Sequence, residues 1–439
     1  MVKQRRVGRA CAKPTGMSLP RSLVFLLVLS VVLGGASLYV GRRAAETFGL
    51  GVRGRKIMVG VPLASIALMI LSRVLGLREV GQVAFTVLLA LLISAVLLGA
   101  VDLVQLGARW IERLVLRRTS SAVATSPAPV EPVLATAAAS GVAEPIVAAA
   151  PPEAPKAPER RVFLGQVAAG SAMVVGSTSS LYGAVFGRHD YVIEEVPLVL
   201  PGLSKKLDGY TLVQLSDIHL GTFVGEPEMR AAEELVRKAR PDRIVLTGDL
   251  IDSDPRYAEA LGRLVRRLAP LARDGVTAIP GNHDHYAGIR QAVAALEGAG
   301  ARVLRNDGLV IGDARDGIAL LGVDDVWARR NDPSNAPDLD LAISKVPADL
   351  PRVLLCHNPV FFPEAAGKVA LQISGHTHGG QVNLGALRPG KLVLPYGYIE
   401  GLYERAGSRL YVNRGFGTAG PPARVGAAPE VTRIVLSAS

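Results

Sequence analysis

The sequence predicts an α/β protein in which a membrane region of apolar helices precedes a globular domain with a largely parallel sheet covered by helices. Two observations predict this organisation. Long runs without any charged residue fall early in the 439 residues, and 49% of all residues are hydrophobic, a high share for a wholly soluble protein. From about residue 190, segments patterned like strands alternate with segments patterned like helices, which is typical of parallel sheets.

The apolar runs lie at residues 22–40, 57–72 and 80–101, and arginines flank them. A helix needs about 20 apolar residues to cross a bilayer. Buried core helices of a soluble domain are the alternative, but helices that are apolar on all faces between arginines are typical of membranes. We expect about three transmembrane helices in residues 1–118. They are interpreted as an anchor and not as a transporter, because no charge lies mid-span and only Asp102 lies near an end.

The net charge of +11 belongs to this membrane region. Residues 1–118 contain 17 Lys or Arg and four acids, whereas the rest of the chain contains 32 Lys or Arg and 34 acids. The later domain therefore lacks the overall positive charge that phosphate-backbone binding needs, and we expect no nucleic-acid partner. The two cysteines, Cys11 and Cys356, cannot form a disulfide framework or a thiolate zinc site.

Two segments join the membrane region to the globular domain. Residues 119–159 contain 8 Pro, 13 Ala and no aromatic residue, a composition that predicts a disordered linker. Residues 160–188 begin with Arg-Arg-Val-Phe-Leu and continue with a weakly apolar stretch. This segment is either a fourth apolar helix that spans the membrane or an anchor similar to a twin-arginine export signal, although such signals do not normally stand in mid-chain.

The distribution of basic residues predicts how the chain is oriented. The loop 42–56 and the linker side contain 12 Lys or Arg, against eight in the amino-terminal tail and the loop 73–79. Because basic loops stay in the cytoplasm, we expect a multi-pass protein whose catalytic domain faces away from the cytoplasm. Translation from Met17 in place of Met1 would remove five of the eight and strengthen this preference.

The globular domain is predicted to span residues 190–439. Its first strands are expected at 210–215, 243–247 and 277–279, and its first helices at 226–240, 256–272 and 289–297. After residue 302 the elements become short strands, which predict a second sheet; they are expected at 302–305, 309–311, 318–322, 353–356, 370–374, 410–413 and 431–436.

Residues able to bind metal follow these strands directly. They stand in the motifs S-D-I-H, G-D-L, G-N-H-D-H, C-H-N-P and G-H-T-H-G-G-Q. Ligand sites of open α/β sheets lie at the carboxyl ends of the strands, so residues far apart in sequence can share one site. The candidate metal ligands are Asp217, His219, Asp249, Asn282, His357, His376 and His378.

The residue types indicate the kind of metal site. Histidine, aspartate and one amide oxygen suit Mn, Fe or Zn better than Ca or Mg. Seven ligands are too many for one tetrahedral ion, but they suit two divalent ions with a bridging carboxylate and a water between them. Taken alone, each residue has an ordinary alternative; an aspartate or asparagine after a strand is often a turn residue. The five motifs together favour the metal site.

The other polar residues in and near the motifs have separate interpretations. His283 is a candidate general acid, and its neighbour Asp284 is expected to orient the imidazole ring. His285 has no assigned role and is not expected to be a ligand. Asp252 is expected to support a ligand without binding metal itself, and His189 lies outside the motifs.

The motifs D-x-H, G-D, G-N-H-D, H and G-H-x-H resemble those of the calcineurin-like metallophosphoesterases over about residues 190–439. The resemblance implies a four-layer αββα sandwich of two mixed sheets. It also implies that one metal is held by Asp217, His219, Asp249 and His378. The other would be held by Asn282, His357, His376 and again Asp249, which would be the bridge.

Within that family, S-D-I-H-L-G, G-H-T-H-G-G-Q and the tail from Asn413 to Thr432 resemble the bacterial membrane-bound or twin-arginine-exported phosphodiesterases. Two departures are the Asp in G-N-H-D-H-Y, where that branch often has Glu, and the longer linker. The resemblance implies a location in the bacterial cytoplasmic membrane.

The predicted function is that of a phosphoric ester hydrolase, a phosphodiesterase or pyrophosphatase anchored in the membrane. Two cations would lower the pKa of a bridging water, and the hydroxide would attack phosphorus in line. The membrane location favours a lipid-linked phosphoester as substrate. A non-catalytic, membrane-tethered binding scaffold on the same fold is the alternative, and it would tolerate missing ligands, whereas none is missing here. The oligomeric state is not predicted.

Overall fold

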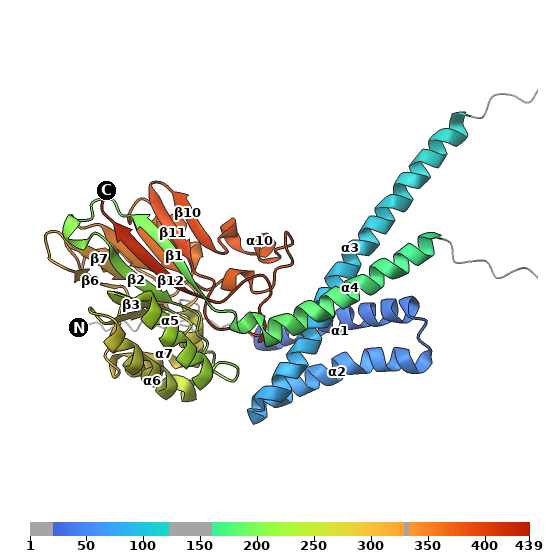
Figure 1. The fold of residues 1–439 in the computed structure, drawn as a ribbon, viewed down its shortest axis with the longest axis horizontal. Helices are drawn as coiled ribbons and strands as arrows, with labels where there is room; N and C mark the ends of the chain where they lie inside the picture. The colour runs from blue at the N-terminus through green and yellow to red at the C-terminus, as the bar shows by residue number, and fades with distance from the viewer. Residues whose placement is uncertain (1–20, 123–159, 329–332) are drawn as a thin grey trace, which may run out of the picture.

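The computed structural model describes residues 21–122, 160–328 and 333–439. Four helices form a bundle on one side, and a globular domain with two sheets lies on the other (Figure 1). The predicted linker from residue 123 onward lies outside the described residues, as do both candidate start residues, Met1 and Met17.

The bundle helices cover the four predicted apolar segments. They are α1 (Arg21–Thr47), α2 (Val52–Leu75), α3 (Arg78–Ala122) and α4 (Arg160–Val185). In the part of the chain that the structure describes, three stretches are long and apolar enough to cross a membrane: Val52–Ser72, Arg78–Leu114 and Val162–His189. Helix α3 runs four residues into the segment predicted as linker, because neither proline nor glycine interrupts the chain between Gly107 and Pro127.

Small residues and one acidic residue hold the bundle together. A Cβ atom on Gly176 of α4 would lie 2.3 Å from the Ser94 hydroxyl of α3, so these helices can approach only because position 176 is glycine. Asp102 of α3 accepts hydrogen bonds from the Tyr39 hydroxyl and the Arg43 guanidinium of α1, both at 2.6 Å. Its charge is therefore paired within the bundle.

The globular domain contains two six-stranded mixed sheets. The first has the strand order β1 (Val192–Val199), β12 (Glu430–Ser437), β2 (Tyr210–Leu215), β3 (Arg243–Thr247), β4 (Val276–Ile279) and β5 (Arg302–Val303). The second has the order β10 (Gly401–Arg405), β11 (Ser408–Val412), β9 (Leu371–Ser374), β8 (Arg352–Leu355), β7 (Ile318–Gly322) and β6 (Asp307–Ile311). Strands β2 to β5 are parallel to one another, and so are β7, β8, β9 and β11.

The sheets pack face to face with helices on both outer sides. Leu212 and Val245 of the first sheet share an apolar core with Leu320 and Ile373 of the second. The first sheet is covered by α5 (Glu226–Ala239), α6 (Ala258–Leu268) and α7 (Asn282–Glu297), and the second by α8 (Leu339–Ile343) and α9 (Phe362–Ala365). A short helix, α10 (Gly390–Val393), lies beside the second sheet (Figure 1). The predicted four-layer αββα fold class is confirmed.

The structure corrects three details of the prediction. Helix α7 begins at Asn282 and not at residue 289, with a break at Gly288 where φ is 112°. The predicted helix 256–272 ends at Leu268 and continues as a 3₁₀ turn. Strands β1 and β10 were not predicted, because both are edge strands with several exposed side chains and therefore lack a clear apolar pattern.

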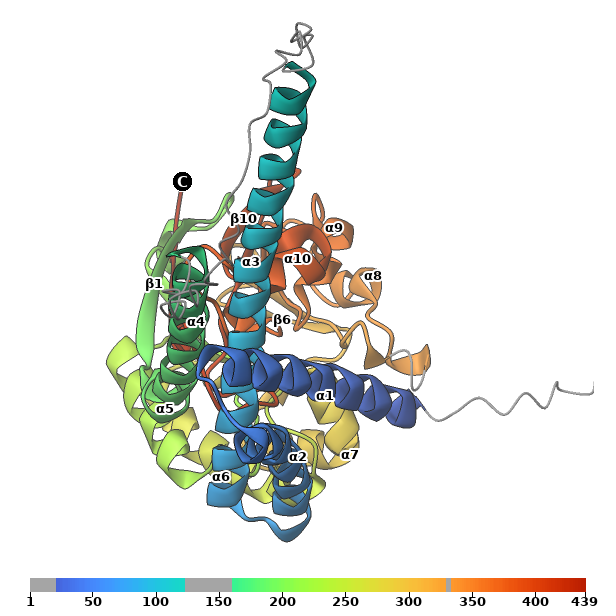
Figure 2. The same cartoon turned by 90° about the vertical axis from the view of Figure 1, so that its right-hand side faces the viewer.

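The bundle contacts the globular domain through α3 and α4. Arg78 of α3 forms an ion pair with Glu228 of α5 at 2.6 Å. Further along α3, the Phe85 ring packs edge-on against Phe223 at 5.7 Å. At the end of α4, the Gly183 carbonyl accepts a hydrogen bond from the Arg424 backbone N–H at 3.0 Å. Figure 2, seen from the bundle side, shows α3 and α4 in front of the domain.

Candidate metal centre

The candidate ligands leave strands of both sheets at their carboxyl ends. Asp217 and His219 follow β2, Asp249 follows β3 and Asn282 begins α7 after β4. From the second sheet, His357 follows β8, and His376 and His378 follow β9. The two sheets face each other, so these loops converge at one edge of the sandwich. All seven predicted ligands are brought together there.

Five of the seven residues have an unusual backbone conformation. The φ angle is positive at Asp217 (52°), His219 (52°), Asp249 (51°), His376 (73°) and His378 (52°). This left-handed region is uncommon for residues other than glycine, and each such residue costs about 1–3 kcal/mol, which the surrounding structure must offset. Strained residues gathered at one place are typical of a functional site.

One group of possible ligand atoms comes from Asp217, His219 and His378. Their donor atoms lie within 4.8 Å of one another. The Nε2 atoms of His219 and His378 are 3.0 Å apart, and His378 Nε2 is 3.5 Å from Asp217 Oδ1. All three residues are buried. Two imidazoles and one carboxylate that point into one small volume form a suitable site for a divalent cation.

A second group comes from Asp249, His357 and His376. His357 Nε2 lies 3.1 Å from Asp249 Oδ2 and 3.2 Å from His376 Nδ1. The same Asp249 oxygen is 3.7 Å from His219 Nε2, a member of the first group. Asp249 therefore lies between the two groups, in the position that a bridging carboxylate requires.

Asn282 provides an independent test of whether these residues suit a metal. Its side chain is buried, and its Oδ1 atom has no hydrogen-bond partner among the residues that the structure describes. An unpaired buried carbonyl oxygen costs about 1–3 kcal/mol. A cation would satisfy this oxygen, so the donor set fits a metal centre.

Hydrogen bonds outside the donor set hold the ligands in place. The His357 Nδ1–H donates to the Thr247 carbonyl at 2.8 Å, so Nε2 is the ring nitrogen that faces Asp249. Asp217 accepts bonds from the Ser216 hydroxyl at 2.6 Å and from the His376 backbone N–H at 3.0 Å. Such supporting contacts fix the orientation and basicity of metal ligands.

Burial and neighbouring charges shift the pKa values of the candidate ligands, some upward and some downward. Burial, together with the nearby charge of Asp249, raises the pKa of Asp217. Burial also acts to raise the pKa of Asp249, but the charge and hydrogen bond of His357 outweigh it and hold that pKa well below its usual range. Burial and the charge of His357 lower the pKa of His376 to about 3. An anionic Asp249 and a neutral His376 are the forms that bind metal.

His283 lies at the edge of the site, and the structure corrects the group that orients it. Its Nδ1–H donates to the Asp252 carbonyl at 2.5 Å, and the side chain is 27% exposed. Asp284 does not contact the ring; its carboxylate instead accepts three backbone N–H bonds, from Gly281, Leu250 and Ile251. The bond at Nδ1 leaves Nε2 as the other ring nitrogen of this partly exposed side chain.

The two remaining histidines of interest lie elsewhere. The His285 side chain is buried, and its Nε2 lies 3.3 Å from Asp324, which also forms an ion pair with Arg305. His285 thus belongs to a polar cluster beside the site. His189 contacts Arg188 at 2.9 Å, between α4 and the first sheet.

Arg424 is a site residue that the sequence analysis missed. Its fully buried guanidinium donates to the carbonyls of Arg414, Gly415 and Gly417, and it contacts His378 Nδ1 at 3.0 Å. Burial lowers the pKa of Arg424 to about 10, so it stays charged at neutral pH. The available signal was that residue 424 is the single charge between positions 414 and 430 in a segment rich in glycine and proline.

The fold and the site together define a metal-dependent phosphoesterase. The chain matches the model of the calcineurin-like phosphoesterase family over residues 210–380. It is 33% identical to an uncharacterised metallophosphoesterase of Bacillus subtilis over 64% of this chain and 98% of that protein. A similar relative from Aquifex aeolicus is 30% identical over 60% of this chain and 97% of that one. The chain belongs to the calcineurin-like metallophosphoesterase family.

A further relative is described as a transmembrane protein. A zebrafish protein described as a transmembrane protein with a metallophosphoesterase domain is 32% identical over 60% of this chain. The match covers 62% of the zebrafish protein.

Proposed function

We propose that the protein hydrolyses phosphoesters, as a phosphodiesterase or pyrophosphatase, with two divalent cations chosen from Mn, Fe and Zn. Asp217, His219 and His378 would hold one cation, while Asn282, His357 and His376 would hold the other. Asp249 would contact both. The observation that carries the proposal is that the donor atoms of six of these residues, all buried except the half-buried His376, gather in two clusters at the strand ends, and that the buried Asn282 Oδ1 has no hydrogen-bond partner among the described residues. When bound, the cations would activate water as Lewis acids and neutralise charge on phosphoryl oxygens.

His283 is proposed as the general acid. The hydrogen bond from Nδ1–H to the Asp252 carbonyl fixes the ring, and the partly exposed Nε2 is left to give a proton to the leaving alkoxide. The His283 backbone N–H also donates to Asp249 Oδ1 at 2.8 Å, so the acid and the bridging carboxylate are held in a fixed relation. An alkoxide leaving group needs this proton because it is a strong base.

The helices are proposed to anchor the chain in the bacterial cytoplasmic membrane, with residues 1–118 and 160–188 forming one bundle. The unbroken helix α4, which packs against α3 at Gly176, supports a fourth bundle helix over a cleaved export signal. Residues 119–159 would link the bundle helices, and residues 190–439 would form the catalytic domain.

A lipid-linked phosphoester is the proposed substrate class. The loop that carries His219 also carries Phe223, which packs against Phe85 of α3. Arg424, which contacts His378 through its side chain, is bonded to α4 through its backbone. Loops that carry candidate ligands therefore touch the bundle, so a phosphoryl group at the membrane surface would lie near the site.

The proposal is tested on the full-length protein in detergent. Metal content is measured by elemental mass spectrometry. Hydrolysis is measured on a bis-aryl phosphate, a mono-aryl phosphate and a lipid pyrophosphate, with and without chelator. We expect hydrolysis that chelator removes and Mn²⁺ restores, with preference for the diester or the lipid pyrophosphate. Absent or chelator-insensitive hydrolysis of all three would overturn the enzyme assignment and favour a non-catalytic scaffold.

A further inference from the structure

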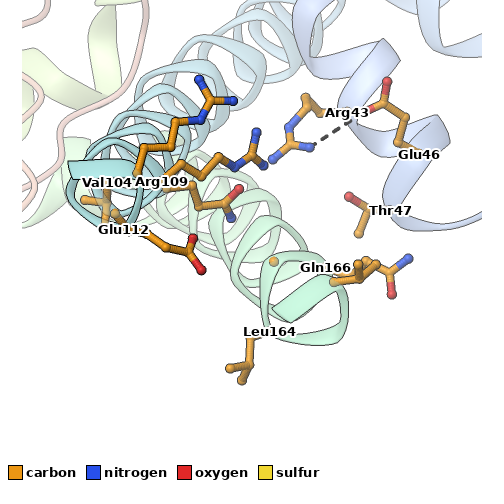
Figure 3. A pocket seen from close by; sticks show the side chains of 13 residues that line it. Arg43, Glu46, Thr47, Val104, Arg109, Glu112, Leu164 and Gln166 are labelled. Carbon is orange, nitrogen blue, oxygen red and sulfur yellow. Dashed lines mark ion pairs between the residues drawn. The ribbon is translucent and has the colours of Figure 1, made fainter. Parts of the chain in front are cut away.

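A second polar cavity lies in the helical bundle, far from the metal site. It has a volume of about 750 Å³ and opens between the end of α1, the middle of α3 and the beginning of α4 (Figure 3). Its polar lining is provided mainly by Arg43, Glu46, Gln105, Arg109, Glu112, Arg113 and Gln166. The α3 and α4 residues that contact the globular domain, such as Phe85 and Gly183, are at the opposite ends of those helices.

The charges in this cavity are unevenly paired. Arg43 is bonded to Asp102 at 2.6 Å and lies 3.5 Å from Glu46, so its charge is neutralised. Arg109 and Arg113 have no ion pair with a carboxylate in the described ranges of the chain. They stand one turn apart on α3, where two like charges destabilise a helix. An anion placed between their guanidinium groups would remove that repulsion and accept planar, two-pronged hydrogen bonds.

The surroundings of the arginines indicate where such an anion would come from. Val104, Val162 and Leu164 line the same cavity and are 72%, 51% and 53% exposed. The apolar run 80–101 ends shortly before Arg109, so the cavity lies where the apolar part of α3 changes to its charged part. Apolar side chains beside paired arginines match an amphiphile, with acyl chains along the helices and a phosphate at the arginines.

We propose that this cavity binds the headgroup of an anionic phospholipid, with its phosphate held by Arg109 and Arg113. Gln105 and Gln166 offer hydrogen bonds to headgroup hydroxyls or esters. Glu46 and Glu112, the two lining carboxylates, limit the total positive charge, which favours a single phosphate over a polyanion. The inference rests on the membrane anchoring proposed above but not on the catalytic activity. The bound lipid would fasten α1, α3 and α4 together at the end of the bundle remote from the metal site.

The test compares two double variants that remove the same charge. R109Q/R113Q alters the cavity, whereas R53Q/R55Q removes two exposed arginines of α2 that do not line it. Full-length protein in a non-ionic detergent is titrated with short-chain phosphatidylglycerol and phosphatidylcholine, and binding is followed by native mass spectrometry. We expect wild type and R53Q/R55Q to bind phosphatidylglycerol in preference to phosphatidylcholine. We expect R109Q/R113Q to bind phosphatidylglycerol at least roughly tenfold more weakly than wild type.

Further outcomes separate the possible failures. The proposal would be overturned if wild type bound both lipids equally, or if the two variants lost phosphatidylglycerol binding to the same extent. Inorganic phosphate that binds wild type as tightly as phosphatidylglycerol would also overturn it, since the lipid would then contribute nothing. Hydrolysis of a soluble aryl phosphate should be unchanged in R109Q/R113Q. If alkaline carbonate releases the wild-type chain from membranes, the anchoring itself fails, whereas retention without lipid preference rejects only the headgroup site.

Discussion

Among single residues, Asp249 is the one that both halves of the candidate site share. Its Oδ2 atom lies near His357 of one group and His219 of the other, while its Oδ1 accepts the His283 backbone N–H. The backbone at Asp249 is held at a φ of 51°, so its direction is set by the fold and not by side-chain choice. A change of charge at this position should therefore affect metal binding and turnover together.

We expect Asp249→Asn to lower kcat on the order of 10³-fold, because the loss of several kcal/mol of charge stabilisation translates into a factor of that size. The substitution keeps the shape and leaves an acceptor for the His283 N–H, so the fold should persist. Steady-state kinetics and elemental analysis check this expectation. If the Asp249→Asn variant kept both the turnover and the metal content of the wild type, Asp249 would not be the bridge.

His283→Asn is expected to separate proton transfer from metal binding. Loss of a general acid typically costs 10²- to 10⁴-fold in rate, and we expect kcat to fall within about that range while metal content stays near the wild-type value. His189→Asn, at a histidine outside the site, is the matched control. The loss should be smaller for substrates with acidic leaving groups, which need less protonation. An unchanged kcat on an alkyl ester would reject the role.

Arg424 is expected to act as a positioning residue for His378. Arg424→Met would leave several buried carbonyls unpaired, and each unsatisfied group costs about 1–3 kcal/mol. We therefore expect the free energy of unfolding to fall by about 3 kcal/mol or more. Metal affinity, measured by calorimetry, should fall with stability. Arg424→Lys keeps a charge but not the fork of donors, and should recover only part of both. The control is Arg409→Met, at a partly exposed arginine. Normal metal affinity in Arg424→Met would leave only a structural role.

At the level of elements, the junction between α4 and the loop that contains Arg424 connects the bundle to the site. A Cβ atom on Gly183 would lie 2.6 Å from Val425 and 2.8 Å from the Arg424 carbonyl. The close approach exists because residue 183 is glycine, and it allows the Arg424 N–H to reach the Gly183 carbonyl. The helix end and the His378 environment are therefore packed as one unit.

Gly183→Ala should loosen this junction. Overpacking of this kind costs about 1–3 kcal/mol, so we expect a lower midpoint of thermal unfolding and faster proteolysis between α4 and the domain. Gly170→Ala is the control on the same helix, where the added methyl group would be 4.0 Å from its neighbours. Equal behaviour of the two variants would show that α4 does not brace the domain.

The elements differ in how far the sequence predicts them. Central strands such as β3 and β7 were predicted with their observed bounds, because both faces are buried and their residues are almost all apolar. Edge strands β1 and β10 escaped prediction because exposed faces dilute the pattern. The first turn of α7 escaped because its residues, Asn-His-Asp-His, favour turns in isolation and become helical through a capping carboxylate, that of Asp284.

The candidate site was predictable where it depends on motif and strand order. Residues after strands of parallel sheets share one edge, and this rule predicted the convergence of Asp217 and His378 from opposite halves of the domain. The positions of supporting groups did not follow from it. Asp252 orients His283 through a backbone carbonyl, and Arg424 is bound by carbonyls, so neither contact leaves a side-chain pattern in the sequence.

At the level of the whole molecule, the two ends of the bundle differ in chemistry. The end near the domain contacts it through Phe85, Phe223 and Gly183. The other end collects basic residues of three helices, namely Arg42, Arg43, Arg53, Arg55, Lys56, Arg109 and Arg113. Because basic residues favour the cytoplasmic side, we predict from this arrangement that the catalytic domain is extracytoplasmic.

Labelling of single cysteines tests this orientation in a chain whose Cys11 is replaced by serine; Cys356 is buried. Arg405→Cys lies on exposed strand β10 of the domain, and Phe48→Cys lies at the opposite end of the bundle, between α1 and α2. On intact spheroplasts, a membrane-impermeant maleimide should label position 405 but reach position 48 only after permeabilisation. Labelling of position 48 alone would place the catalytic domain in the cytoplasm, and the lipid headgroup cavity would then face outward. In that case the arginine-rich end would contradict the rule that basic residues remain inside. Because the metal site and the headgroup cavity lie at opposite ends of the bundle, the same experiment assigns each of them to a leaflet.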